Sequence, residues 1–145
     1  MCPNVDPAAF PGLNAGNHRD TSPQDTRYNC IAFAASVQNR WWWPDPFGQG
    51  YWPPNVPRVE TVDAFVRAYE TLGYVRCADG TLESGYEKVA IYVDSFGGPT
   101  HAARQLPSGK WTSKLGGEED IEHDTLEAVE GPLYGRSNAY LKRPI

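Results

Sequence analysis

The sequence predicts an α+β fold in which helical segments and antiparallel strands occupy different parts of the chain. Segments with helical periodicity lie in the first half, whereas segments rich in β-branched and aromatic residues, separated by Gly- and Pro-containing turns, dominate the second half. The length of 145 residues and the hydrophobic fraction of 40% fit one globular domain. With neither an internal repeat nor a domain boundary in the sequence, we expect residues 1–145 to form a single domain.

Composition excludes several classes of protein. The net charge of −5 argues against a nucleic-acid-binding groove, which needs a basic face. No apolar run approaches the roughly 20 residues that span a bilayer, and the N-terminus lacks the charged start and the apolar stretch of a signal peptide. We therefore expect a protein that contacts neither nucleic acid nor membrane and is cytoplasmic, or exported without a cleaved leader.

The three cysteines, Cys2, Cys30 and Cys77, are odd in number and irregularly spaced. This spacing matches neither a disulfide framework nor a zinc site. We expect reduced thiols, no bound metal ion and no cofactor.

The chain begins with residues 1–27, whose abundant Pro, Asn, Asp and Gly are typical of an extended arm or loop. A helix that is apolar nearly all round is expected over residues 30–40, with Asn29 as its N-cap. Residues 41–57 contain five prolines and four tryptophans, which excludes a regular helix or a central strand.

A second helix is expected over residues 60–72, where an apolar stripe is followed by Gly73 as a C-terminal cap. A short helix over residues 121–130, capped by Asp120, and an edge strand over residues 134–141 complete the chain. Strands are expected between these helices at residues 74–77, 88–93, 100–106 and 110–115, the last two forming a hairpin.

Cys30 is the first candidate for chemistry because it falls in the first turn of the expected helix. Unpaired backbone N–H groups and the positive end of the helix dipole favour a thiolate over a thiol at such a position. A thiolate there is a nucleophile, and the same amides can contribute to an oxyanion hole. The alternative is a structural Cys30, since free cysteines are among the most buried residues.

His101 is the candidate base. It follows the turn Gly97-Gly98-Pro99-Thr100 and is expected at the mouth of a sheet, from which it can approach the start of a helix packed across that sheet. Its alternative role is that of a surface or capping histidine.

The stretches YNCIA, residues 28–32, and EKVAIYVDSFGGPTHAARQLPSGKWTSKLG, residues 87–116, resemble NlpC-type and CHAP-type amidases of the papain-like superfamily. The resemblance covers about half of the chain. It implies a papain-like core, with a central N-terminal helix packed on a small antiparallel β-sheet. It also implies Cys30 as nucleophile and His101 as base, the latter beginning a strand that a tight turn joins to a partner strand.

The resemblance places the residue that orients the imidazole at Ser113. Because NlpC-type enzymes usually carry His there, Asp120 or His123 is an alternative partner, and Asp120 is equally explained as a helix N-cap. For a second oxyanion donor the candidates are Gln24, at the spacing seen in papain-like peptidases, and Tyr28, close to the nucleophile.

Several aromatic and basic residues are candidates for substrate binding. Rigid rings on the loop after the nucleophile helix can form a substrate wall or fill the bottom of the core. The candidates are Trp42, Trp43, Trp52, Arg104 and Trp111.

The leading hypothesis is a thiol hydrolase that cleaves or deamidates an amide bond through a Cys30–His101 pair. Its partner would be a peptide, a peptidoglycan stem peptide or a protein. Compact papain-like domains also serve as toxin or effector modules, for which an inhibitor or immunity protein would be a further partner. The alternatives are a non-catalytic binding module that uses the Trp/Tyr-rich loop 41–53 and, third, a metal site built from His101, His123 and Asp120.

Overall fold

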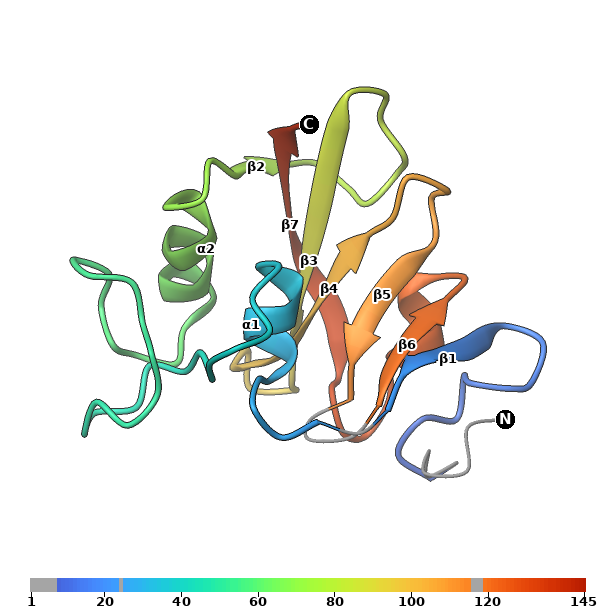
Figure 1. The fold of residues 1–145 in the computed structure, drawn as a ribbon, viewed down its shortest axis with the longest axis horizontal. Coiled ribbons are helices and arrows are strands. Elements are labelled where there is room, and N and C mark those ends of the chain that lie inside the picture. The colour runs from blue at the N-terminus through green and yellow to red at the C-terminus, as the bar shows by residue number, and fades with distance from the viewer. Residues whose placement is uncertain (1–7, 24, 116–118) are drawn as a thin grey trace.

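A single seven-stranded antiparallel sheet dominates the computed structural model, which describes residues 8–23, 25–115 and 119–145 (Figure 1). The strand order is β1-β6-β5-β4-β3-β7-β2. The strands are β1 (His18–Ser22), β2 (Val75–Cys77), β3 (Tyr86–Val93), β4 (Pro99–Gln105), β5 (Trp111–Lys114), β6 (Asp120–His123) and β7 (Arg136–Pro144). The helices are α1 (Cys30–Ala34), α2 (Val62–Glu70) and the 3-10 helix η1 (Leu126–Val129).

The predicted fold class is wrong. The α+β fold, with a papain-like core of a central N-terminal helix on a small sheet, is replaced by a mainly antiparallel β-structure. Helix α1 has five residues, and α2, with nine, is the longest helix of the described chain. Helix periodicity in the first half was overvalued, because much of the chain there is loop.

The first helix is shorter than residues 30–40 because the chain turns sharply at Ser36. Its φ of 65° is left-handed, which a helix interior does not allow. All five residues of α1 are nevertheless buried, as its apolar sequence requires. The second predicted helix is confirmed as α2, where the Thr61 side chain accepts a hydrogen bond from the Ala64 amide and Gly73 turns the chain with a φ of 92°.

The predicted strands are confirmed as β2, β3, β4 and β5, with bounds shifted by one or two residues. The predicted helix over 121–130 is wrong, because residues 120–123 form β6 and only residues 126–129 are helical. Asp120 therefore caps no helix. The alternation of buried Ile121 and His123 with the half-buried Glu122 is the period of a strand.

The C-terminal strand is interior to the sheet rather than at its edge. β7 pairs with β3 over eight residue pairs and with β2 on its other side. Part of the predicted N-terminal arm is also a strand, since β1 pairs with β6 and forms one edge of the sheet. Long-range pairing of this kind depends on partners that a local sequence window does not contain.

Both faces of the sheet are covered. One hydrophobic cluster joins α1, α2 and one face of the sheet through Ala102, Val89 and Ile91. The second cluster joins Tyr92, Ala103 and the opposite face to η1. Figure 1 shows α1 in front of β4 and β5, and α2 to the left of β3 and β7. Within the described chain, no helix is long and apolar enough to cross a membrane.

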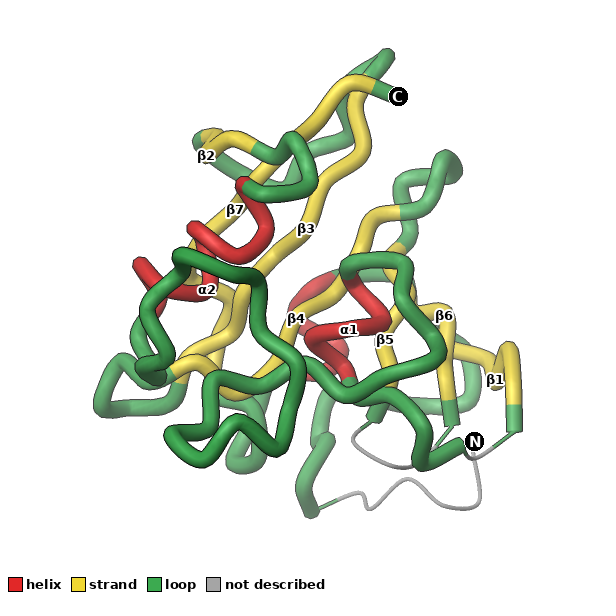
Figure 2. The backbone as a smooth tube through the Cα atoms, turned by 60° about the vertical axis from the view of Figure 1, so that its left-hand side comes forward, coloured by secondary structure: helices red, strands yellow, loops and turns green. Residues whose placement is uncertain are grey.

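The sheet opens between β4 and β5. The two strands pair at Arg104–Thr112 and Gln105–Trp111, beside their connecting turn, and no further ladder pair is formed between them within their described lengths. Helix α1 contacts both strands, and Figure 2 shows it lying across them. We call the region between residues 100–103 of the β4 side and residues 113–115 of the β5 side, which lies beyond these two pairs, the β4–β5 seam.

Candidate functional site at the β4–β5 seam

Cys30 is the first residue of α1, as predicted, and Asn29 is confirmed as the N-cap by a hydrogen bond from the Ala32 amide to its side chain at 3.1 Å. The Cys30 thiol donates to the carbonyl oxygen of Thr100, with an Sγ–O distance of 4.0 Å. The backbone amide of Ala102 also acts on the sulfur. The sulfur thus contacts the strand residues on either side of His101.

Cys30 is a neutral thiol rather than the expected thiolate. Burial raises the pKa of its thiol to about 11, and the backbone amides and the charge of Lys114 oppose this effect only in part. The side chain is 7% exposed. Desolvation therefore outweighs the amides at the start of this short helix.

His101 is fully buried as the third residue of β4, so the expected position at the mouth of the sheet is wrong. Its ring stacks on Tyr134 with centroids 4.0 Å apart and meets Tyr92 edge-on at 5.2 Å. Burial, followed by the neighbouring His123, lowers the pKa of His101 well below its usual value. The imidazole is therefore neutral.

Ser113 and His123 extend from His101 as a buried chain of hydrogen bonds. His101 Nε2 lies 3.0 Å from Ser113 Oγ, which lies 2.8 Å from His123 Nε2. His123 Nδ1 lies 2.8 Å from the carbonyl oxygen of Thr125. The sequence brought Ser113 and His123 forward as alternative partners for His101, and the structure places both in one series.

The carbonyl oxygen of Thr125, at the end of this series, fixes the direction of each hydrogen bond. A carbonyl only accepts, so His123 Nδ1 carries a proton and donates it to Thr125. Neutral His123 then has a bare Nε2, which accepts from the Ser113 hydroxyl, and the Ser113 oxygen in turn accepts from His101 Nε2–H. His101 is left with a bare Nδ1, a buried atom to which no described residue donates a hydrogen bond.

Cys30 and His101 approach the seam from different faces of β4. Ala102 packs with α1, so strand alternation turns the His101 side chain toward Tyr92 and Ala103 on the opposite face. In an extended strand, however, the carbonyl of residue 100 and the amide of residue 102 point to one common edge. The sulfur that contacts both lies at this edge, and the His101 ring reaches across the same seam to Ser113.

Tyr134 links the imidazole to the thiol side of the seam. It stacks on His101 and, together with Cys30, lines a cavity, while its carbonyl accepts a hydrogen bond from the Thr100 hydroxyl. A Cβ atom at the next residue, Gly135, would lie 1.8 Å from the carbonyl oxygen of Val93. Only glycine permits this approach, which is the sequence signal that could have located Tyr134.

Asp120 and Tyr28 form a separate polar cluster on the α1 side of the seam. The Tyr28 hydroxyl donates to Asp120 Oδ2 at 2.6 Å, and the Ser22 hydroxyl donates to the same atom at 2.5 Å. Lys114, fully buried, lies 3.8 Å from Asp120 Oδ1 and 4.5 Å from the Tyr28 ring centre. Asp120 is therefore no partner of His101, and the Tyr28 hydroxyl is engaged by Asp120.

The remaining predicted residues are largely elsewhere. Gln24 lies outside the described residues. Trp42, Trp52 and Trp111 are buried core residues, each at most 4% exposed. Arg104 places its guanidinium 5.7 Å from the Phe33 ring centre. Of the five predicted substrate-binding residues, Trp43 alone lines the cavity at Cys30.

The cavity at Cys30 has a volume of about 330 Å³ and is lined by Asn29, Cys30, Trp41, Trp43, Thr100 and Tyr134. Sequence reasoning placed Trp41 in the aromatic loop but did not select it. It also missed Thr100 and Tyr134, which lack an obvious motif.

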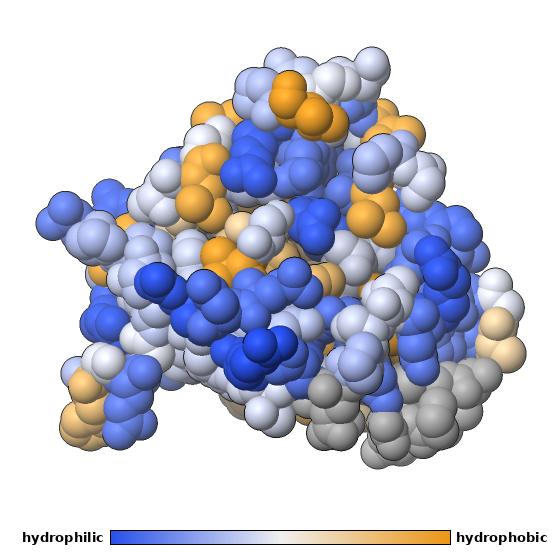
Figure 3. Space-filling view, in the orientation of Figure 1, coloured by the Kyte–Doolittle hydropathy of each residue, from blue (hydrophilic) through white to orange (hydrophobic). Residues whose placement is uncertain are grey.

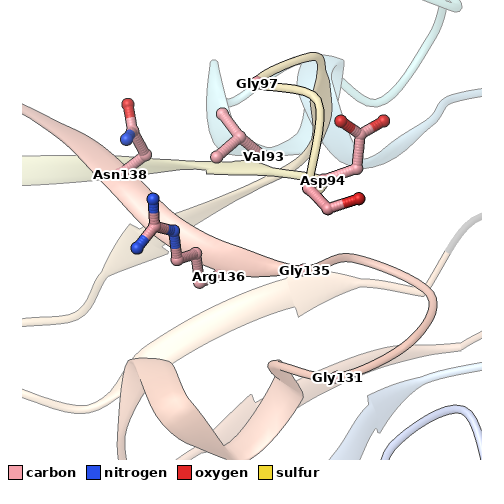
Figure 4. Close-up of a pocket in the computed structure, with 8 residues that line it drawn as sticks. Val93, Asp94, Gly97, Gly131, Gly135, Arg136 and Asn138 are labelled. Atoms are coloured by element: carbon pink, nitrogen blue, oxygen red, sulfur yellow. The ribbon is translucent and has the colours of Figure 1, made fainter.

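A larger cavity of about 550 Å³ lies between the turn after β3 and the start of β7. Arg136 and Asn138 project from β7, whereas Asp94 projects from the turn (Figure 4). The Asp94 carboxylate accepts hydrogen bonds from the amides of Phe96 and Gly98, and none of the predicted site residues lines this cavity.

The proposed metal site of His101, His123 and Asp120 does not form. Among the described residues, no group of three or more His, Cys, Asp or Glu side chains is arranged to hold a metal ion. Asp120 and the two histidines belong to different hydrogen-bonded clusters, as the contacts above show.

Comparison with known proteins gives one result. Residues 19–142 match a family described as a domain of unknown function (DUF7689). The chain belongs to this family. The match includes Cys30, His101, Ser113 and His123. No curated protein and no solved structure matches the chain.

The buried histidines make stability depend on pH. Burial lowers the pKa of His123 from 6.5 to about 4, so the unfolded chain takes up this proton at a higher pH than the folded one. The contribution of neutral His123 to the free energy of unfolding is complete above pH 6.5 and is lost as the pH falls toward 4. At about 1.4 kcal/mol per pH unit, it amounts to roughly 3 kcal/mol, and His101 acts in the same direction.

Urea unfolding at a series of pH values measures this dependence. We expect the free energy of unfolding to fall between pH 6.5 and 4, with a shallower fall in His123→Gln. An unchanged slope in that variant would show that His123 is not held neutral.

Proposed function

We propose that the protein is a thiol hydrolase that cleaves or deamidates amide bonds with Cys30 as nucleophile and His101 as general base. The observation that carries this proposal is the bare, buried Nδ1 of His101, a residue whose two neighbours in β4, Thr100 and Ala102, contact the Cys30 sulfur. A buried nitrogen without a donor costs free energy, so its presence in a folded protein calls for a reason. Accepting the proton of a nearby thiol is such a reason.

The reaction proceeds in two halves. Cys30 Sγ bonds to the substrate carbonyl carbon while its proton passes to His101 Nδ1, and His101 then returns this proton to the leaving nitrogen as the C–N bond breaks. A water molecule attacks the resulting thioester and gives its proton to Nδ1. The carboxylic acid departs, and the thiol recovers the proton. Ser113 and His123 hold the imidazole in the tautomer that this sequence needs.

The resting thiol must turn for this reaction, because its hydrogen bond is made to Thr100 and not to His101. Rotation about the Cα–Cβ bond moves only the sulfur and keeps the backbone of α1 in place. With a neutral thiol and a neutral imidazole, proton transfer accompanies attack, as it does when a serine is the nucleophile.

Alkylation tests the neutral resting state. A pKa of about 11 leaves about one thiol in ten thousand ionised at pH 7, so the rate of Cys30 alkylation by iodoacetamide should rise nearly tenfold per pH unit from pH 7 to 10. Mass spectrometry of the Cys30 peptide gives this rate. A plateau below pH 8 would instead show a preformed thiolate–imidazolium pair.

The setting follows from the same proposal. The proposed substrate is a peptide, a peptidoglycan stem peptide or a protein. The His101–Ser113 hydrogen bond supports a relationship to NlpC-type and CHAP-type amidases. Both described cysteines are free, which favours a reducing compartment such as the cytoplasm. An inhibitor or immunity protein remains a proposed partner only if the domain serves as a toxin or effector.

Capture of the thioester tests the proposal. The protein is mixed with N-acetylated amino-acid anilides and quenched in acid, and the Cys30 peptide is examined for the mass of the acyl group. We expect the acyl group on Cys30 and release of aniline. Release of aniline without an adduct, equally fast in Cys30→Ala, would overturn the proposal.

A binding module without catalysis is the second candidate. The raised pKa of Cys30 and the hydrogen bond from its thiol to Thr100 favour it. Such a module would still use the cavity formed by Trp41 and Trp43, and it would bind amides without releasing aniline.

A further inference from the structure

We propose that the cavity at Cys30 binds one bulky apolar side chain, preferably aromatic, of the acyl group that the thiol attacks. This inference rests on the proposed hydrolase function and names its substrate class: amides of aromatic and large apolar amino acids.

Trp41 and Trp43 form one wall because the chain between them is extended. The Tyr51 amide donates to the Trp41 carbonyl at 2.8 Å, and the Trp43 amide donates to the Tyr51 carbonyl at 3.0 Å. Side chains alternate along such a segment, so Trp42 turns into the core while the rings on either side line the cavity.

The wall is fixed to the nucleophile. Asn29, the residue before Cys30, accepts a hydrogen bond from the Trp42 amide at 3.0 Å and donates to the Trp42 carbonyl at 2.6 Å. Trp43 also packs edge-on against Phe65, with ring centres 5.4 Å apart. These contacts hold the backbone of the wall and the Trp43 ring in place beside Cys30, so this part of the cavity is preorganised.

The Asn29 and Thr100 side chains that line the cavity form hydrogen bonds within the protein. The Asn29 side chain accepts from the Ala32 and Trp42 amides and donates to the Trp42 carbonyl, and the Thr100 hydroxyl donates to Tyr134. No charged side chain is among the described residues that line it. A charged ligand would lose its hydration without compensation, whereas an aromatic ring would gain contact with the indoles.

The size and the surroundings confine the ligand to one side chain. A volume of about 330 Å³ is near the small end of the range of ligand cavities. Behind the two indoles lies a second cavity of about 230 Å³, bordered by Asp45, Gln49 and Gly50, where a longer apolar chain would meet polar groups. Figure 3 shows apolar side chains scattered over the viewed face rather than joined in a larger patch.

Two matched chloroacetamides, N-methyl and N-benzyl, test the proposal on the intact protein. We expect Cys30 to react at least about tenfold faster with the benzyl reagent, while half-buried Cys77 serves as an internal reference that shows little preference. In Trp41→Ala the preference at Cys30 should fall at least fivefold. Phe47→Ala, which removes an 85% exposed ring from the same loop, should retain it.

The two proposals fail separately. Equal reaction of Cys30 with both reagents, reaction with neither, or an unchanged preference in Trp41→Ala would overturn the aromatic site whatever the hydrolytic activity. A strong preference of Cys30 for the benzyl reagent, with no acyl adduct from N-acetyl-phenylalanine anilide, would support the aromatic site and contradict the hydrolase function. Faster hydrolysis of the glycine or aspartate anilide than of the phenylalanine anilide would overturn the substrate class alone.

Discussion

Cys30→Ala is expected to reduce the hydrolysis of N-acetyl-phenylalanine anilide by at least about a thousandfold, to the rate without protein. Loss of the nucleophile removes the covalent route, and loss of a single member of such a catalytic unit costs about as much as the loss of all its members. Folding should be little affected, because alanine fits in place of a cysteine whose hydrogen bond to the Thr100 carbonyl is long, at 4.0 Å.

Cys77→Ala is the matched control. Cys77 is half-buried at the end of β2, away from the seam, and its thiol donates to the Asp79 carbonyl. Its replacement should leave the rate of anilide hydrolysis unchanged. Equal rates of anilide hydrolysis by the unsubstituted protein, Cys30→Ala and Cys77→Ala would show that Cys30 takes no part in the reaction.

Lys114→Met is expected to lower the free energy of unfolding by about 3–5 kcal/mol. Lys114 and Asp120 are at most 2% exposed, so removal of the ammonium group leaves a buried carboxylate without its counter-charge. The hydroxyls of Ser22 and Tyr28 still donate to Asp120, which limits the loss. Urea unfolding measures the change.

Lys110→Met provides the comparison. Lys110 precedes β5, and its half-exposed side chain pairs with Glu122 and Asp124 at 3.8 and 3.5 Å. Pairs of this kind contribute at most about 1 kcal/mol. The double variant Lys114→Met/Asp120→Asn should recover part of the stability, because it removes both charges. If Lys114→Met lowers the free energy of unfolding no more than Lys110→Met does, a structural role for the buried Lys114–Asp120 pair is contradicted.

The sequence predicted those parts of the site that depend on local chemistry. The N-cap at Asn29 and the start of a helix at Cys30 follow from residues that are neighbours in the chain. The hairpin of β4 and β5, which brings Ser113 to His101, follows from the Pro-Ser-Gly turn between two strand-like segments.

The sequence did not predict features that depend on distant pairing. β1 and β7 are strands because β6, β3 and β2 lie beside them, and residues 120–123 form β6 rather than the expected helix because β1 and β5 pair with them. The thiolate expected at Cys30 fails for a related reason. The position of the helix start was correct, but the burial that raises the pKa comes from packing against β4.

The tryptophan triplet shows how one local pairing decides which side chains line the cavity. The three indoles are equivalent in composition, yet the pairing of Trp41 and Trp43 with Tyr51 sends Trp42 inward and its two neighbours to the cavity. Choosing Trp41 instead of Trp42 from the sequence would have required knowledge of this pairing, which the five prolines of the loop obscure.

Long-range ¹⁵N NMR of the His101 imidazole most directly tests the claim that its bare Nδ1 serves Cys30. We expect a proton on Nε2, none on Nδ1, and a change in the Nδ1 resonance when iodoacetamide modifies Cys30. A proton on Nδ1, or an Nδ1 resonance that does not respond to modification of Cys30, would contradict it.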